Sequence, residues 1–144
     1  MVSEPLRTDL ILEDDPRLLA SVKAAVFHPA QHLEFAPSEQ AELAEAAEEA
    51  CRGAFPLLDS ADGDLHLIVD EFPDRIEVSV EYSGEPLPAA GLDSFAVAGA
   101  GDEAPLGVSG AMLLTRVDRV LYETHDRLSR MTLVKYLPGR APKF

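Results

Sequence analysis

From Asp64 the hydrophobic pattern of this chain switches to a period of two, and that switch limits the possible folds more than any other feature. Before it, apolar residues such as Leu18, Val22 and Val26 recur at helical spacing. After it, apolar and polar residues alternate, most clearly in Ile76-Glu77-Val78-Ser79-Val80-Glu81. There the apolar side chains are expected to face a core while Glu77, Ser79 and Glu81 face outward. The pattern therefore predicts two helices before Asp64 and two strands directly after it.

The expected segments follow one another in a simple order. They are a strand at 8–12, a helix starting at 14 that ends or kinks at His28-Pro29, a helix at 38–55, strands at 65–70 and 75–81, a helix at 110–117, and strands at 119–124 and 130–136. Residues 83–110 hold six glycines and three prolines without a clear period, which is typical of a functional loop or lid. The order predicts an α+β fold, a two-layer α/β sandwich with a mainly antiparallel sheet and helices on one face.

Length and composition indicate one globular domain over residues 1–144. Hydrophobic residues make up 47% of the 144 residues, enough for a core of its own. No apolar run approaches the roughly 18–20 residues that a membrane helix needs, and the N-terminus lacks the features of a signal peptide. We therefore expect a cytoplasmic protein that does not enter a membrane. Cys51 is the only cysteine, which excludes an internal disulfide and a cysteine-based zinc site.

Charge is distributed unevenly along the chain. The net charge is −14; residues 1–115 contribute 5 basic and 23 acidic residues, a net of −18, and residues 116–144 contribute 7 basic and 3 acidic residues, a net of +4. Such an acidic body argues against nucleic-acid binding, which needs a basic surface. It favours a protein partner with a basic surface, although solubility alone is an alternative reason for the acidity.

Several segments carry a resemblance to a known family, in order and at matching spacing. They are Asp15–Leu19, Ala46–Cys51, Asp74–Val80, Gly107–Leu114 and Val117–Tyr122. In this order they resemble the GHKL ATPase fold, and within it the anti-sigma-factor serine/threonine kinases of bacterial partner-switching systems. The resemblance covers about residues 8–137. It implies the sandwich already expected, and it implies a homodimer that meets through the first helix and the first strand.

The resemblance also implies a catalytic residue in the second helix. The family has a glutamate base there, followed four residues later by an asparagine that holds Mg²⁺. The matching residues are Glu49 and Gly53, and glycine offers no side chain to a metal ion. Glu48 and Glu49 alternatively belong to a solvated acidic helix face.

The nucleotide-binding loops of the family are altered as well. Tyr82 stands where an aspartate reads adenine, Gly84 is retained from the first glycine box, and Pro86 removes a backbone N–H. No lysine or arginine lies in residues 76–115 to neutralise a triphosphate. The second glycine box implies phosphate contacts from Gly107, Ser109 and Gly110 at the start of a helix.

Together these departures favour a non-catalytic regulator that binds a sigma-factor-like or STAS-domain-like protein and has a degenerate ATP site. We expect no cofactor and no metal under this interpretation. The alternative is an active ATP-dependent serine/threonine kinase with Glu49 as base, which would require ATP and Mg²⁺.

Three other groups invite a catalytic or metal-binding interpretation and have a simpler one. His28 and His32 have metal-ligand spacing on a helix, but Pro29 is expected to break that helix, which favours surface histidines. Cys51 follows the pattern of a buried small residue, although the neighbouring Arg52 is typical of a reactive thiol.

The third group lies near the C-terminus. His125, Asp126 and Ser129 are close in sequence, which a hairpin turn explains better than a hydrolase triad.

Overall fold

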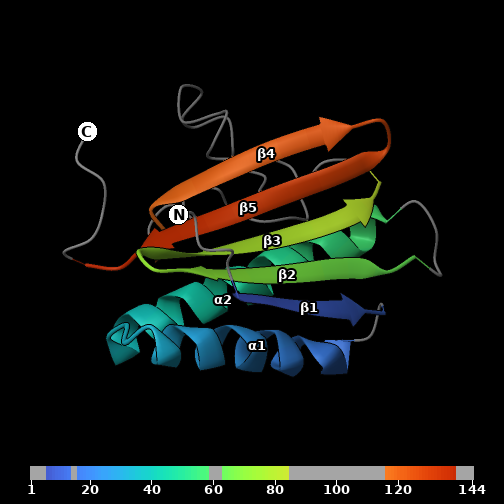
Figure 1. The fold of residues 1–144 in the computed structure, drawn as a ribbon. Helices are drawn as coiled ribbons and strands as arrows, with labels where there is room; N and C mark the ends of the chain where they lie inside the picture. Colours follow the sequence, from blue (N-terminus) through green and yellow to red (C-terminus); the bar gives the residue numbers. More distant parts are fainter. Residues whose placement is uncertain (1–5, 14–15, 59–62, 85–115, 139–144) are drawn as a thin grey trace, which may run out of the picture.

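The computed structural model describes residues 6–13, 16–58, 63–84 and 116–138, and in these residues it forms a sheet covered by helices on one face (Figure 1). The five strands are β1 Leu6–Leu12, β2 Leu65–Phe72, β3 Arg75–Ser83, β4 Arg119–His125 and β5 Leu128–Tyr136. The helical segments are η1 Pro16–Leu18, α1 Leu19–His32, α2 Pro37–Ala54 and η2 Phe55–Leu57. Every neighbouring strand pair is antiparallel, in the order β1-β2-β3-β5-β4. The predicted α+β class is confirmed.

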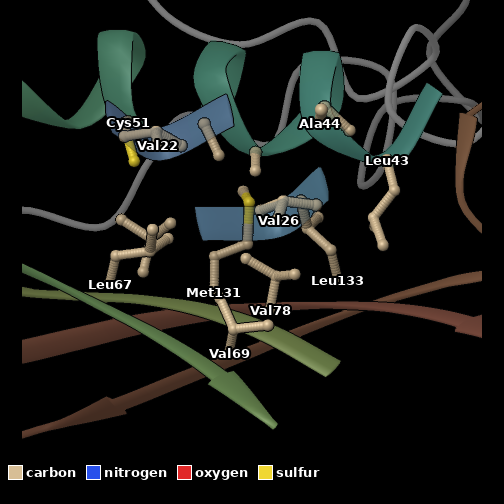
Figure 2. Packing of buried hydrophobic residues seen from close by; sticks show 14 of the residues in the cluster. Val22, Val26, Leu43, Ala44, Cys51, Leu67, Val69, Val78, Met131 and Leu133 are labelled. Carbon is tan, nitrogen blue, oxygen red and sulfur yellow. The ribbon is translucent and has the colours of Figure 1, made fainter. Parts of the chain in front are cut away.

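The core lies between the helix layer and the sheet (Figure 2). Val22 and Val26 of α1 and Leu43 of α2 are fully buried there, above Val78 and Leu133 of the sheet. The alanines predicted for the packed side of α2 are buried as well: Ala46, Ala47, Ala50 and Ala54. Small side chains on this face let the α2 backbone lie close to its neighbours, so that shape complementarity is achieved without bulky residues.

Strand β3 confirms the predicted alternation with one exception. Ile76, Val78 and Val80 are fully buried toward the helices. Ser79 points to the opposite face yet is only 1% exposed, and its hydroxyl lies 3.0 Å from the hydroxyl of Thr132 on β5. Arg130 Nη2 also donates to Ser79 Oγ at 3.1 Å. The outward face of the sheet therefore has a buried polar centre, which alternation alone does not indicate.

The prediction was that α1 ends or kinks at His28-Pro29, and the expected end is wrong. The helix continues through Pro29 to His32, and Leu33 N donates to Pro29 O at 3.0 Å. Proline removes only one helical hydrogen bond this close to the C-terminal end, and Pro29 is buried. Burial of the ring offsets the missing bond.

The turn between α1 and α2 contains a residue with positive φ. Glu34 has φ 64°, its N–H donates to Gln31 O, and the N–H of Phe35 donates to Ala30 O, each at 3.0 Å. This pair of bonds is the Schellman arrangement, in which glycine normally occupies the left-handed position. A glutamate there is unusual, because its Cβ crowds the backbone.

Two further expectations concern membrane helices and the segment that follows β3. No helix in the described ranges is long and apolar enough to cross a membrane. The predicted helix at 110–117 and the loop 83–110 lie outside the described residues except at their ends.

Candidate functional site

Glu49, the expected base, lies on the side of α2 that is turned away from the core. Its side chain is 25% exposed, and its Oε2 accepts a hydrogen bond of 2.9 Å from Arg52 Nη1. Arg52 Nη2 donates at the same time to Glu48 Oε1 at 2.8 Å. Glu48 also lies 3.6 Å from Lys23 Nζ of α1. One guanidinium therefore holds both Glu48 and Glu49.

This arrangement affects what Glu49 can do chemically. The hydrogen bond to Glu48 is the main reason that the pKa of Arg52 is raised above its ordinary value, with Glu49 adding to it. Arg52 thus stays charged beside the two glutamates. A general base must present its carboxylate to the hydroxyl that it deprotonates. An arginine occupies one carboxylate oxygen of Glu49, as expected for a residue that stabilises the helix surface.

The next turn of α2 supplies no ligand or nucleophile. Gly53 is buried and has no side chain. Cys51 is fully buried, and burial raises the pKa of its thiol, with the nearby Glu48 adding to the effect. The alternative that Arg52 activates the Cys51 thiol is not supported, because Arg52 binds Glu48 and Glu49 instead. The interpretation as a buried small residue is confirmed.

At the end of β3, the residue that the resemblance aligns with an adenine-reading aspartate is part of the core. Tyr82 is 2% exposed and belongs to the same hydrophobic cluster as Val78 and Val80. A phenol ring that packs in the core cannot replace an aspartate that accepts a hydrogen bond from an adenine amine. The aromatic side chain at this position therefore stabilises the fold.

Gly84 has a structural role that the sequence did not indicate. Its φ is 154°, its N–H donates to Arg127 O at 3.0 Å, and its carbonyl accepts 2.9 Å from Ser129 Oγ. It also forms a bridge with Leu58, which follows α2 and η2. Gly84 thus connects the end of β3 both to the β4–β5 turn and to the segment that follows α2. The two described candidate residues, Glu49 and Gly84, are consequently at the same end of the molecule.

The remaining phosphate-binding candidates, Gly107, Ser109 and Gly110, and also Pro86, lie outside the described residues. At the two described positions that the resemblance assigns to a metal ligand and to adenine recognition, the structure has the buried Gly53 and the core residue Tyr82. Over the described ranges, no group of three or more His, Cys, Asp or Glu side chains is placed to hold a metal ion.

The remaining candidates are two histidines of α1 and three residues around the β4–β5 turn. His32 Nδ1 lies 2.7 Å from Glu71 Oε1, and both His28 and His32 are exposed. They are surface histidines as expected, although Pro29 does not break the helix that carries them. His125 and Asp126 are about nine-tenths exposed in the β4–β5 turn, whereas Ser129 is buried and bonded to Gly84. A hairpin, not a triad, explains them.

Sequence reasoning missed the cations that balance the glutamates of α2. Arg116 Nε lies 3.3 Å from Glu45 Oε2, and Lys23 of α1 approaches Glu48. Both come from segments remote in sequence, so no local pattern indicates them.

A separate open hollow of about 440 Å³ lies at the other end of α2, lined by Leu33, Glu34, Ala36, Glu39, Leu137 and Pro138. It does not include any of the candidate residues.

Comparison of the chain with models of protein families and with curated proteins finds no match in either case.

Proposed function

We propose that this protein is a protein-binding regulator of the anti-sigma-factor-kinase type in which the nucleotide site has become part of the structural framework. The observation that carries the proposal is the Arg52 clamp on Glu49, at 2.9 Å, one residue before Gly53. The carboxylate that a kinase would use as a base is engaged, and the position that would hold Mg²⁺ has no side chain. Tyr82 of the sheet layer supports the same conclusion, because its side chain is buried in the core.

The partner in this proposal is a sigma-factor-like or STAS-domain-like protein with a basic surface. The net charge of −14 supports a basic partner, because complementary fields accelerate encounter and discriminate against acidic competitors. The exposed Glu45 and the half-buried Glu42 of α2 offer such a partner an acidic surface that needs no nucleotide. Binding without phosphorylation is therefore the function that these residues support best.

A nucleotide thermal-shift assay tests the proposal. A ligand that binds only the folded state at about 100 times its Kd stabilises it by about 2.7 kcal/mol. We expect no shift with ATP or ADP plus Mg²⁺. The variant Arg52→Gln is a useful companion, because it releases Glu49 while Gly53 and Tyr82 stay in place. It too should show no nucleotide shift. A clear Mg²⁺-dependent shift in the unaltered chain would instead favour the active kinase.

A further inference from the structure

The open hollow of about 440 Å³ lies between the α1–α2 turn and the end of β5, at the end of α2 opposite to Glu49. Figure 1 shows that turn and the end of β5 on the same side of the molecule. Leu33, Leu137 and Pro138 give the hollow an apolar lining. Its volume falls within the range of about 300–1,000 Å³ that is typical of ligand pockets. The hollow is therefore large enough to receive side chains of another molecule.

Two carboxylates at this hollow have no cation beside them in the described residues. Glu34 and Glu39 both line the hollow, and neither forms an ion pair with any residue that the structure describes. Farther along α2 the situation differs, since Glu45 lies 3.3 Å from Arg116 Nε. The two glutamates of the hollow are thus available to a basic group.

The two carboxylates are also accessible. Glu34 is exposed, and Glu39 is half-buried. Glu39 Oε1 accepts a hydrogen bond of 3.2 Å from Ala36 N. A carboxylate has a second oxygen with lone pairs of its own, so Glu39 can accept from another donor while it keeps this bond.

The cations nearest to the hollow along the chain and in the fold already have carboxylate partners. His32 Nδ1 lies 2.7 Å from Glu71 Oε1. The carbonyl of Asp74 accepts 2.8 Å from Leu137 N, and the side chain of Asp74 accepts 2.8 Å from Arg75 Nη1. Neither cation can turn to the glutamates of the hollow without leaving its own partner. The described residues therefore leave these glutamates to a cation from another source.

A basic side chain with an apolar neighbour matches this combination of apolar lining and carboxylate rim. Lysine and arginine lay an aliphatic stem along apolar surface while the charged end stays near water. Arginine fits better than lysine, because its planar guanidinium presents five N–H donors and can bind two carboxylates at once. A single exposed ion pair contributes little, so a segment with several basic and apolar side chains suits the hollow better than a free cation.

We propose that this hollow is a docking site for an arginine-containing basic segment of a partner protein, whose arginines bind Glu34 and Glu39 and whose apolar side chains contact Leu33 and Leu137. The partner is a different protein, because a second copy of a chain with a net charge of −14 is repelled from an acidic rim. The inference does not rest on the proposed function, since it requires neither a nucleotide nor the absence of one. The positive φ of Glu34 is consistent with it, because strained residues cluster at binding sites.

An NMR titration of the isotope-labelled chain with a defined peptide tests the docking site. The probe is a hexapeptide in which arginine and leucine alternate, blocked at both ends so that its termini carry no charge. We expect it to shift the backbone amide signals of five residues that line the hollow: Leu33, Glu34, Ala36, Glu39 and Leu137. A peptide with glutamine in place of each arginine should bind at least about tenfold more weakly. Shifts confined to other parts of the chain, equal binding of the glutamine peptide, or no shift at millimolar peptide would overturn the proposal.

Matched charge variants separate the hollow from the overall acidity of the chain. Glu34→Gln combined with Glu39→Gln removes both carboxylates of the rim, and glutamine at position 39 can keep the capping bond. This pair should raise the Kd of the arginine peptide about tenfold. Glu13→Gln combined with Glu42→Gln makes the same change of charge away from the hollow and should alter the Kd by less than about twofold. Circular dichroism verifies that both variants are folded, and equal weakening by the two pairs would overturn the proposal.

The basic residues at the end of this chain are the competing occupant. Arg140 and Lys143 follow Pro138 closely in sequence. If the arginine peptide binds only to a chain shortened to end at Pro138, these residues and not a partner occupy the hollow, and the proposal is overturned. Equal binding to the full and the shortened chain is the result that we expect.

Discussion

Glu34 is predicted to reduce the stability of this protein, and replacing it with glycine should stabilise the fold. Its φ of 64° and the bonds from Glu34 N to Gln31 O and from Phe35 N to Ala30 O place it at the left-handed position that ends α1. For a residue with a Cβ atom this conformation costs about 1–2 kcal/mol. Its carboxylate also stands at the negative end of the α1 dipole, which adds about 0.3 kcal/mol.

The gain from Glu34→Gly is smaller than this cost, because glycine is freer in the unfolded chain. That freedom offsets about 0.5–1 kcal/mol, so the net stabilisation is about 1 kcal/mol. For a chain of this length we expect the melting temperature to rise by roughly 2–4 °C. Urea unfolding should show a higher midpoint with an unchanged slope, since the buried surface stays the same.

Glu34→Ala separates the two causes. It removes the carboxylate but keeps the Cβ atom, so it should recover only the electrostatic part, about 0.3 kcal/mol. If glycine and alanine stabilise the protein equally, backbone strain at residue 34 is not the cause. If glycine destabilises the protein, the interpretation of the α1–α2 turn is wrong.

Two further predictions concern buried groups. Burial raises the pKa of the Cys51 thiol in the folded state, so as the pH rises the thiol ionises first in the unfolded state. The contribution of the thiol to stability is therefore complete below its unfolded pKa of about 8.5. Above that pH the free energy of unfolding falls by up to about 1.4 kcal/mol per pH unit. Urea titrations from pH 7 to 10 should therefore show a steeper loss for the unaltered chain than for Cys51→Ala, and parallel curves would contradict the burial of the thiol. Ser79→Ala should cost about 1–2 kcal/mol because it leaves Thr132 without its 3.0 Å partner, whereas Ser79→Ala combined with Thr132→Val should cost less than the sum of the single changes. A double-mutant cycle by urea unfolding measures this coupling, and simple additivity would show that the two hydroxyls do not interact.

The parts of the fold that follow from local pattern were predictable. The packed face of α2 and the buried face of β3 depend on side-chain spacing alone, and Leu43, Ala47, Ile76 and Val78 lie where that spacing places them. The passage of α1 through Pro29 was not predictable, since it depends on burial of the ring in the folded protein. A local rule for proline cannot include that contribution.

The candidate site likewise has features that the sequence predicts and features that depend on the tertiary fold. Gly53 and Tyr82 are visible in the amino-acid sequence alone as departures from a family pattern. The pairing of Arg52 with Glu48 and Glu49 follows from helical spacing, but the approach of Lys23 to Glu48 and of Arg116 to Glu45 does not. These contacts join residues 25 and 71 positions apart, so they require the tertiary fold.

We propose above all that this protein binds its partner without nucleotide. Isothermal titration with a sigma-factor-like or STAS-domain-like protein, with and without Mg²⁺-ATP, tests this claim most directly when it is followed by mass spectrometry of the partner. We predict the same dissociation constant in both conditions and an unmodified partner. Binding that requires Mg²⁺-ATP, or a partner that gains a phosphate and loses it with Glu49→Gln, would contradict nucleotide-free regulation.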